Sequence, residues 1–139
     1  MISDLWFGFL KTPLHMEPVH SQNAPQAIGP YSQAIKHGDT LYISGQIGLD
    51  PSTGKFVSDD LQGQTEQVMK NIGAVLEAAG LKYGNVIKCS IFLLDMTRFS
   101  EVNAIYGAYF KAPFPARETV QVSALPAGAL VEVSVTAAL

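Results

Sequence analysis

The chain has 139 residues, of which 47% are hydrophobic and only 15% are charged, and its net charge is −3. This length favours a single domain with an ordinary core, and the lack of a basic excess argues against a nucleic-acid partner. So low a charge for a small domain suggests that another subunit covers part of its surface. The single cysteine, Cys89, excludes an internal disulfide and a cysteine-based zinc site, and we expect its thiol to be buried and inert.

Residues 1–23 are expected to form an N-terminal extension ahead of a single domain at residues 24–139. Aromatic and aliphatic side chains cluster at residues 6–10. This favours either a plain extension, with Met16 as an alternative start, or a short apolar arm that docks on the domain or on a neighbouring subunit. The segment has neither a basic start nor a cleavage site typical of a signal peptide, and no apolar run approaches the about 20 residues of a membrane helix. We therefore expect a cytoplasmic protein without membrane contact.

Hydrophobic periodicity and turn residues predict an α+β fold. Residues 18–30 are rich in Pro, Gln, Asn and Gly and are expected to be irregular. The pattern that follows predicts helices at residues 59–79 and 99–110 and strands at residues 31–36, 40–45, 86–95, 117–124 and 130–136. The order ββαβαββ predicts a mixed sheet with two helices on one face. The last two strands are expected to form a hairpin.

Two charged residues on the last predicted strands are the first candidates for chemistry. Arg117 opens one strand and Glu132 lies within the next. A fixed guanidinium can hold a small carboxylate, and a carboxylate can handle water or a proton. In a hairpin the two side chains would lie roughly 20 Å apart, so a site that uses both would have to form across a subunit boundary. Alternatively, Arg117 is a surface residue beside Phe114, and Glu132 is solvated on an edge strand.

Other candidates lie where predicted elements begin or end. Tyr31 follows a Gly-Pro turn and could present its hydroxyl at a fixed place. Ser44 and Gly45 end a strand, where a missing Cβ lets a ligand approach the backbone. Phe99 and Asn103 share one helix face and could wall a pocket. Each also has an ordinary interpretation, as a turn, a strand end, or a core residue with a cap.

Common templates for cofactor and nucleophile sites are missing from the sequence. It contains neither a phosphate-binding loop nor a dinucleotide fingerprint, and no Gly-x-Ser-x-Gly motif. The three histidines are scattered without metal-ligand spacing.

Taken together, five motifs resemble the RidA/YjgF family of enamine and imine deaminases: GPYSQA (residues 29–34), SGQ (44–46), VN (102–103), FPAR (114–117) and VEV (131–133). The resemblance covers about residues 24–137. It implies a chorismate-mutase-like homotrimer with active sites between subunits. It also implies hydrolysis of short 2-imino acids, such as 2-iminopropanoate and 2-iminobutanoate, to 2-keto acids and ammonium. These substrates would arise from pyridoxal-phosphate-dependent serine and threonine dehydratases. The resemblance also implies that no metal and no cofactor is needed.

The resemblance also implies roles for individual residues. Arg117 would clamp the substrate carboxylate, Glu132 would orient or activate the attacking water, and Tyr31 would lie near the reacting carbon. Backbone groups of Gly45 and Thr119 would hydrogen-bond the ligand, while Asn103 would support the pocket. Many bacterial relatives carry a cysteine at the position where this chain has Thr119. Because threonine has no thiol, a thiol-based role is ruled out at this position of the chain.

Two further function classes stay open at this point. A non-enzymatic module that binds 2-keto acids or other small carboxylates would keep Arg117 but would not need Glu132. In a protein-interaction or chaperone-like trimer, Arg117→Ala would leave the function intact. RNA cleavage, which has been linked to some family members, is disfavoured by the acidic balance of the chain.

Overall fold

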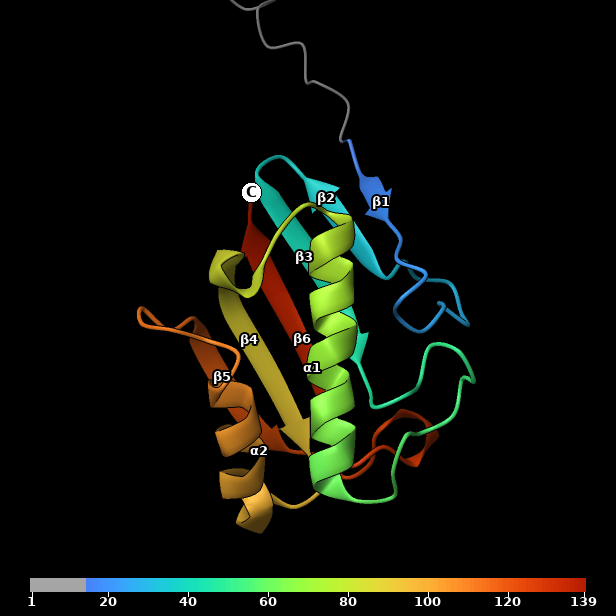
Figure 1. Cartoon of the computed structure of the whole chain (residues 1–139), viewed down its shortest axis with the longest axis vertical. Coiled ribbons are helices and arrows are strands. Elements are labelled where there is room, and N and C mark those ends of the chain that lie inside the picture. Colours follow the sequence, from blue (N-terminus) through green and yellow to red (C-terminus); the bar gives the residue numbers. More distant parts are fainter. Residues whose placement is uncertain (1–14) are drawn as a thin grey trace, which may run out of the picture.

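The computed structural model describes residues 15–139, which form one mixed sheet with both helices on one of its faces (Figure 1). The strand order is β1-β2-β3-β6-β4-β5; only β4 and β5 run parallel, and every other neighbouring pair is antiparallel. The elements are β1 (Glu17–Val19), β2 (Ala34–His37), β3 (Thr40–Gln46), α1 (Leu61–Ala78), β4 (Val86–Leu93), α2 (Phe99–Gly107), β5 (Ala116–Gln121) and β6 (Val131–Ala138). This confirms the predicted α+β fold.

The long helix α1 forms because its apolar residues recur at helical spacing and its start is capped. The Asp60 side chain accepts a hydrogen bond from the Gly63 backbone N–H at 2.7 Å. The buried stripe faces the sheet and includes Leu61, Thr65, Val68, Ile72, Val75 and Leu76. In the part of the chain that the structure describes, no helix is both long and apolar enough to cross a bilayer.

The prediction that the last two strands form a hairpin is wrong. Strand β6 inserts between β3 and β4, whereas β5 lies at the sheet edge and pairs only with β4. Alternate side chains of β6 are buried along its whole length, which suits a central strand, whereas most residues of β5 are exposed. Glu132 therefore pairs with Phe92 on β4, not with Ser123.

Two local features also depart from the sequence-based expectation. A short edge strand, β1, pairs with β2 inside the segment expected to be irregular, and an edge strand tolerates Pro18. The register of β4 shifts between Val86 and Lys88. Ile87 is exposed as a result, although in a regular strand it would share a face with the buried Cys89, two residues further along. Cys89 itself is a free, buried thiol, as predicted; burial raises its pKa and keeps it protonated.

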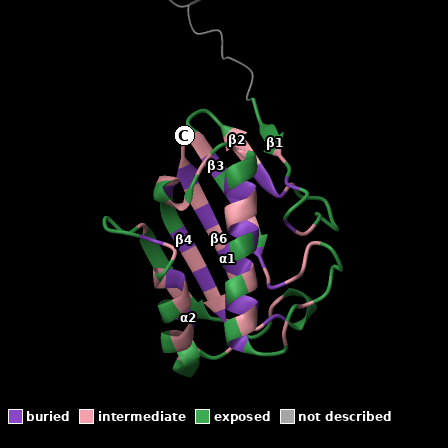
Figure 2. Cartoon of the chain, viewed as in Figure 1, coloured by how far each residue is buried: buried purple, intermediate pink, exposed green. Residues whose placement is uncertain are grey.

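The core lies between the sheet and the two helices, which cover the side of the sheet seen in Figure 2. Both helices lie on that side, so the opposite face of the sheet is open. On β6 the side chains of Val131, Val133 and Val135 enter the core, so Glu132 lies on the open face. The open face also carries large apolar side chains: Tyr42 is 52% exposed and Val120 is 42% exposed. One face of the sheet is thus buried within the chain, and the other carries exposed apolar groups.

Candidate active site

Glu132 lies on the open face of the central strand β6, beside the irregular end of β3. Its carboxylate is half-buried and makes no hydrogen bond within residues 15–139, and burial raises its pKa above the ordinary value. The register of β3 against β6 shifts between Ile43 and Gln46, where Gly45 lies. A Cβ on Gly45 would overlap the Glu132 carboxylate. Glycine at this position therefore provides the space in which the carboxylate lies.

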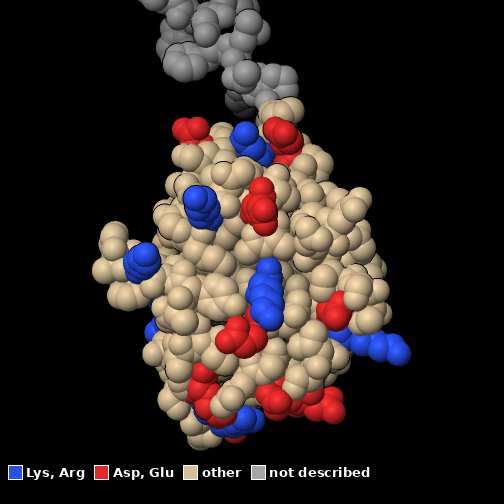
Figure 3. Space-filling view, in the orientation of Figure 1, with Lys and Arg blue, Asp and Glu red and all other residues tan. Residues whose placement is uncertain are grey.

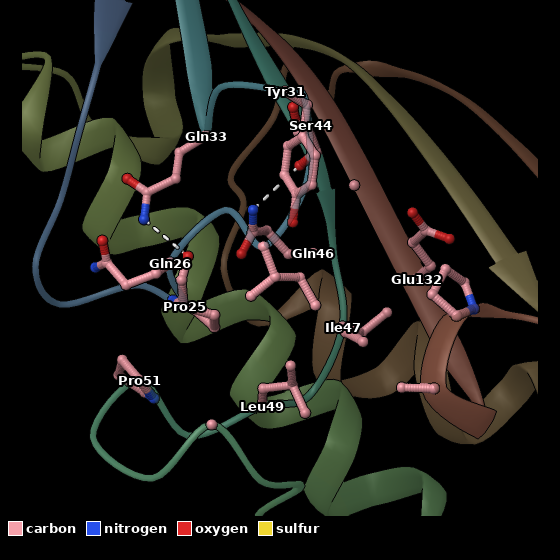
Figure 4. Close-up of a pocket in the computed structure, with 15 residues that line it drawn as sticks. Pro25, Gln26, Tyr31, Gln33, Ser44, Gln46, Ile47, Leu49, Pro51 and Glu132 are labelled. Atoms are coloured by element: carbon pink, nitrogen blue, oxygen red, sulfur yellow. Dashed lines mark hydrogen bonds between the residues drawn. The ribbon is translucent and has the colours of Figure 1, made fainter.

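A cavity of about 600 Å³ extends from this carboxylate. Figure 4 shows Tyr31, Ser44 and Glu132 toward one end of the cavity and Leu49 and Pro51 toward the other. The Tyr31 side chain is about half exposed and borders the cavity. The Ser44 hydroxyl donates a 2.6 Å hydrogen bond to a backbone carbonyl, so it fixes the cavity wall. The cavity thus combines a mostly apolar wall with a few polar groups, as small-molecule sites do.

A buried amide holds one wall of the cavity. The Gln33 side chain is 3% exposed, and its Nε2 donates to the carbonyl oxygens of Ser21, Ala24 and Pro25. Its Oε1 accepts a 2.6 Å hydrogen bond from the Ser21 N–H. Sequence analysis placed Gln33 in a motif but assigned it no role. Pro25 lines the cavity, so this side chain connects β2 to the wall.

Arg117 borders a second cavity of about 450 Å³, which is lined by Asn103, Tyr106, Gly107, Phe114 and Pro115. Its guanidinium donates a 2.7 Å hydrogen bond to the Asn103 side chain and lies over the ring of Phe99 at 5.1 Å. Among the described residues no carboxylate pairs with Arg117, whereas Arg98 pairs with Glu101. The Arg117 guanidinium is therefore held in place while most of its donors stay available to an anion.

Thr119 lies on the same face of β5 as Arg117, two residues further along. Its hydroxyl oxygen is buried and has no hydrogen-bond partner in residues 15–139. The sequence pointed to the Thr119 backbone only. On this face of β5, the unsatisfied Thr119 hydroxyl is thus a second polar group, besides the Arg117 guanidinium, that could bind a ligand.

The candidate residues therefore fall into two half-sites. Tyr31, Ser44, Gly45 and Glu132 line the first cavity; Phe99 and Asn103 contact Arg117 at the second. Arg117 pairs in register with the buried Cys89 and thus lies on the helix-bearing face, opposite to Glu132. One chain cannot bring the two charges together across its own sheet. Within residues 15–139, no three His, Cys, Asp or Glu side chains are grouped as a metal site would need.

Residues 21–139 match the family model described as Endoribonuclease L-PSP. The chain belongs to this family. Over 123 residues it is 51% identical to Reactive Intermediate Deaminase A, chloroplastic, of Arabidopsis thaliana, a match covering 88% of this chain and 66% of that relative. It is 48% identical over 119 residues to the human 2-iminobutanoate/2-iminopropanoate deaminase, covering 86% and 87% of the two chains. The resemblance inferred from the five motifs is thereby confirmed.

Solved structures of the family share this fold. The conserved Rid family protein YyfA of Yersinia pestis is 51% identical, with a TM-score of 0.87 over 90% of this chain and all of that one. TdcF of E. coli, solved with bound serine, is 36% identical, with a TM-score of 0.84 over 88% and 98% of the two chains. The YjgF gene product of E. coli is 40% identical, with a TM-score of 0.84 over 88% and 98%.

Proposed function

We propose that this protein is an imine deaminase that hydrolyses short 2-imino acids, including 2-iminopropanoate and 2-iminobutanoate, to 2-keto acids and ammonium. The observation that carries the proposal is the pair of complementary half-sites. One holds a guanidinium with free donors, and the other holds a half-buried carboxylate of raised pKa beside a cavity. A 2-imino acid offers a carboxylate to the first and a C=N carbon to the second. The names of the Arabidopsis and human relatives support the same chemistry.

The reaction needs positioning and proton transfer, not a strong nucleophile. Arg117 binds the substrate carboxylate through two N–H donors. Glu132 accepts a proton from a water molecule whose oxygen bonds to the carbon of the protonated imine, which gives a neutral tetrahedral carbinolamine. Glu132 returns this proton to the amino nitrogen, and the C–N bond breaks. The carbinolamine hydroxyl gives its proton to Glu132 as the keto group forms, and the departing ammonia takes this proton to become ammonium. The Tyr31 hydroxyl borders this cavity and can hydrogen-bond the oxygen that is added.

The complete site would form between two copies of the chain, in a homotrimer. Because Arg117 and Glu132 lie on opposite faces of the sheet, each copy would supply one half-site to a different neighbour. The open sheet face, with the exposed side chains of Tyr42 and Val120, is the surface that a neighbour would cover. This assembly would also explain the low charge of the chain.

RNA cleavage, which the family description names, has less support in this chain. On the face shown in Figure 3, Lys and Arg side chains are scattered among acidic ones and do not form a continuous stripe. A phosphate backbone needs a cluster of cations. We also propose a cytoplasmic location, although the name of the Arabidopsis relative assigns that protein to the chloroplast.

The test is hydrolysis of 2-iminopropanoate, generated in place by a serine dehydratase. Wild-type protein should accelerate keto-acid release, and Arg117→Ala should abolish the acceleration. Arg98→Ala is the matched control, because Arg98 is already paired with Glu101 and lies outside both cavities. No acceleration by the wild type would refute the deaminase. Binding of pyruvate to such an inactive protein, lost in Arg117→Ala, would instead identify a module that binds keto acids.

A further inference from the structure

One face of α2 forms a cradle for Arg117. Phe99, Asn103 and Tyr106 follow one another at helix positions i, i+4 and i+7, so their side chains lie along one stripe. Asn103 accepts the hydrogen bond from Arg117, and the guanidinium lies over two rings, 5.1 Å from that of Phe99 and 5.0 Å from that of Tyr106. The sequence shows Phe99 and Asn103 on one helix face, and the structure adds Tyr106 to that face.

Tyr106 is the most firmly fixed part of this cradle. Its side chain is 4% exposed, and its ring packs against that of Phe110 at a centroid distance of 4.7 Å. Phe110 in turn contacts Tyr83 at 5.2 Å, edge to face. Arg117, in contrast, belongs to an exposed edge strand. The buried aromatic cluster thus ends at a ring that touches a solvent-facing cation.

We propose that Tyr106 is a positioning residue: its ring holds the Arg117 guanidinium in the orientation that receives the substrate carboxylate. The inference rests on the proposed function, in which Arg117 binds that carboxylate. A guanidinium is planar and its donors lie along its edges, so a ring against its face limits rotation and leaves the edges free. Two polar side chains of the same helix also lie against the group: Asn103 accepts its 2.7 Å hydrogen bond, and the neutral Tyr106 hydroxyl lies within reach of it.

The ring and not the hydroxyl of Tyr106 should carry this role. Burial raises the pKa of the phenol, so the side chain stays neutral and no phenolate pairs with the cation. Tyr106→Phe keeps the ring and should leave KM within about twofold of wild type. Tyr106→Met keeps an apolar side chain but removes the ring. It should raise KM for 2-iminopropanoate by about five- to tenfold, with a much smaller change in kcat.

The matched control is Tyr109→Met, in the turn that follows α2. Tyr109 packs against Tyr83 and donates a hydrogen bond to Glu66, but it does not contact Arg117. It reports the cost of losing an aromatic ring next to the same buried cluster and should leave KM unchanged. If Tyr106→Met fails to fold by circular dichroism, Phe99→Leu removes the half-exposed ring of the same cradle. That variant should show the same rise in KM.

A second readout does not depend on activity. The chain has only two arginines, Arg98 and Arg117, so a proton–nitrogen NMR spectrum shows two side-chain Nε–H signals, and Arg98→Lys assigns them. Ring currents should displace the Arg117 signal in the wild type and in Tyr106→Phe. In Tyr106→Met it should move toward the position of a free arginine and exchange faster with water. Tyr109→Met should not move it.

The outcomes separate the inference from the proposed function. An unchanged KM and an unmoved Arg117 signal in Tyr106→Met would overturn the positioning role, even if Arg117→Ala were inactive. An inactive wild type would refute the deaminase, while the NMR signal would still decide whether Tyr106 orients the guanidinium. A rise in KM that is equal in Tyr106→Met and Tyr109→Met would also overturn the inference, because it would reflect general loosening of α2.

Discussion

The carboxylate of Glu132 occupies the space that a side chain on Gly45 would fill. The two residues lie on neighbouring strands, β6 and β3, at the point where their register shifts. Their contact explains why a glycine stands within a strand, where it costs stability. It also explains how the Glu132 carboxylate can be half-buried without a partner in the described chain, because the missing side chain of Gly45 leaves room for it.

Gly45→Ala should therefore separate activity from stability. The new Cβ would collide with the end of a flexible side chain, which can move at little cost, so the free energy of unfolding should change by less than about 1 kcal/mol. The displaced Glu132 carboxylate would no longer meet the water, and kcat should fall at least about tenfold. Urea denaturation and steady-state kinetics measure the two effects. A Gly45→Ala enzyme with wild-type kcat would show that the position of this carboxylate is unimportant.

Glu132→Gln should lower kcat by about 10²–10⁴-fold with little change in KM, because it removes the proton acceptor and keeps the shape. In the wild type, kcat should fall as the pH drops through the raised pKa of Glu132. The acid limb should thus lie above the ordinary value of 4.5. A pH profile of kcat for both proteins tests this. An acid limb that persists in Glu132→Gln would assign it to another group.

The same substitution should have the opposite effect on stability. Because burial raises the pKa of Glu132 in the folded state, its contribution to stability is fully present below the unfolded pKa and is lost as the pH rises through the folded one. At pH 7 the wild type carries a partly desolvated charge that Glu132→Gln lacks. The variant should melt at a higher temperature at pH 7, and the gain should shrink toward pH 4. A gain of equal size at both values would have a different cause.

Mixing two inactive variants tests the shared site. If each site takes Arg117 from one copy and Glu132 from another, unfolding and refolding Arg117→Ala together with Glu132→Gln at equal amounts should restore about a quarter of wild-type activity, because one random pairing in four is intact. Each variant refolded alone is the control. Sedimentation should give a trimer for every sample. Without recovery in a mixed trimer, the two residues do not act in the same site.

Gln33→Leu should loosen the wall of the first cavity. It leaves the Ser21 N–H and three carbonyls unsatisfied in a buried place, which should cost about 2–4 kcal/mol of unfolding free energy. Gln22→Leu, at an exposed position of the same segment, should cost less than about 0.5 kcal/mol. Urea denaturation gives the values, and faster amide exchange at residues 21–25 should accompany the loss in Gln33→Leu only. Equal costs in both variants would contradict the role of this amide.

The sequence predicted which elements exist better than how they pair. Apolar spacing marks a helix or strand because burial imposes the period, and the strands carrying Arg117 and Glu132 were located correctly. How these strands pair depends on which strand occupies the centre of the sheet. The alternation of apolar and polar residues marks a strand, but it does not show which strands lie beside it. The two residues lie on opposite faces of the sheet, on strands that β4 separates, and not at two positions of one hairpin.

Within the candidate site, the residues with unusual chemistry for their position were found, and those that resemble core were not. Glu132 stands out between two valines, and Arg117 is one of only two arginines in the chain. Tyr106 does not stand out, since an aromatic residue at helical spacing is typical of a core residue. In the structure it both packs in the core and lies against the Arg117 guanidinium. The role of Gln33 likewise becomes visible only in the fold, where residues 21–25 lie against its side chain and accept its hydrogen bonds.

The placement of the two charges on opposite faces has a consequence for how the protein behaves in dilute solution. A protomer by itself would display two unfinished sites and no working one, although its own core is complete. Catalysis would then disappear on dilution while the fold survives. The specific activity would depend on protein concentration, with a threshold set by the affinity of the subunits for one another.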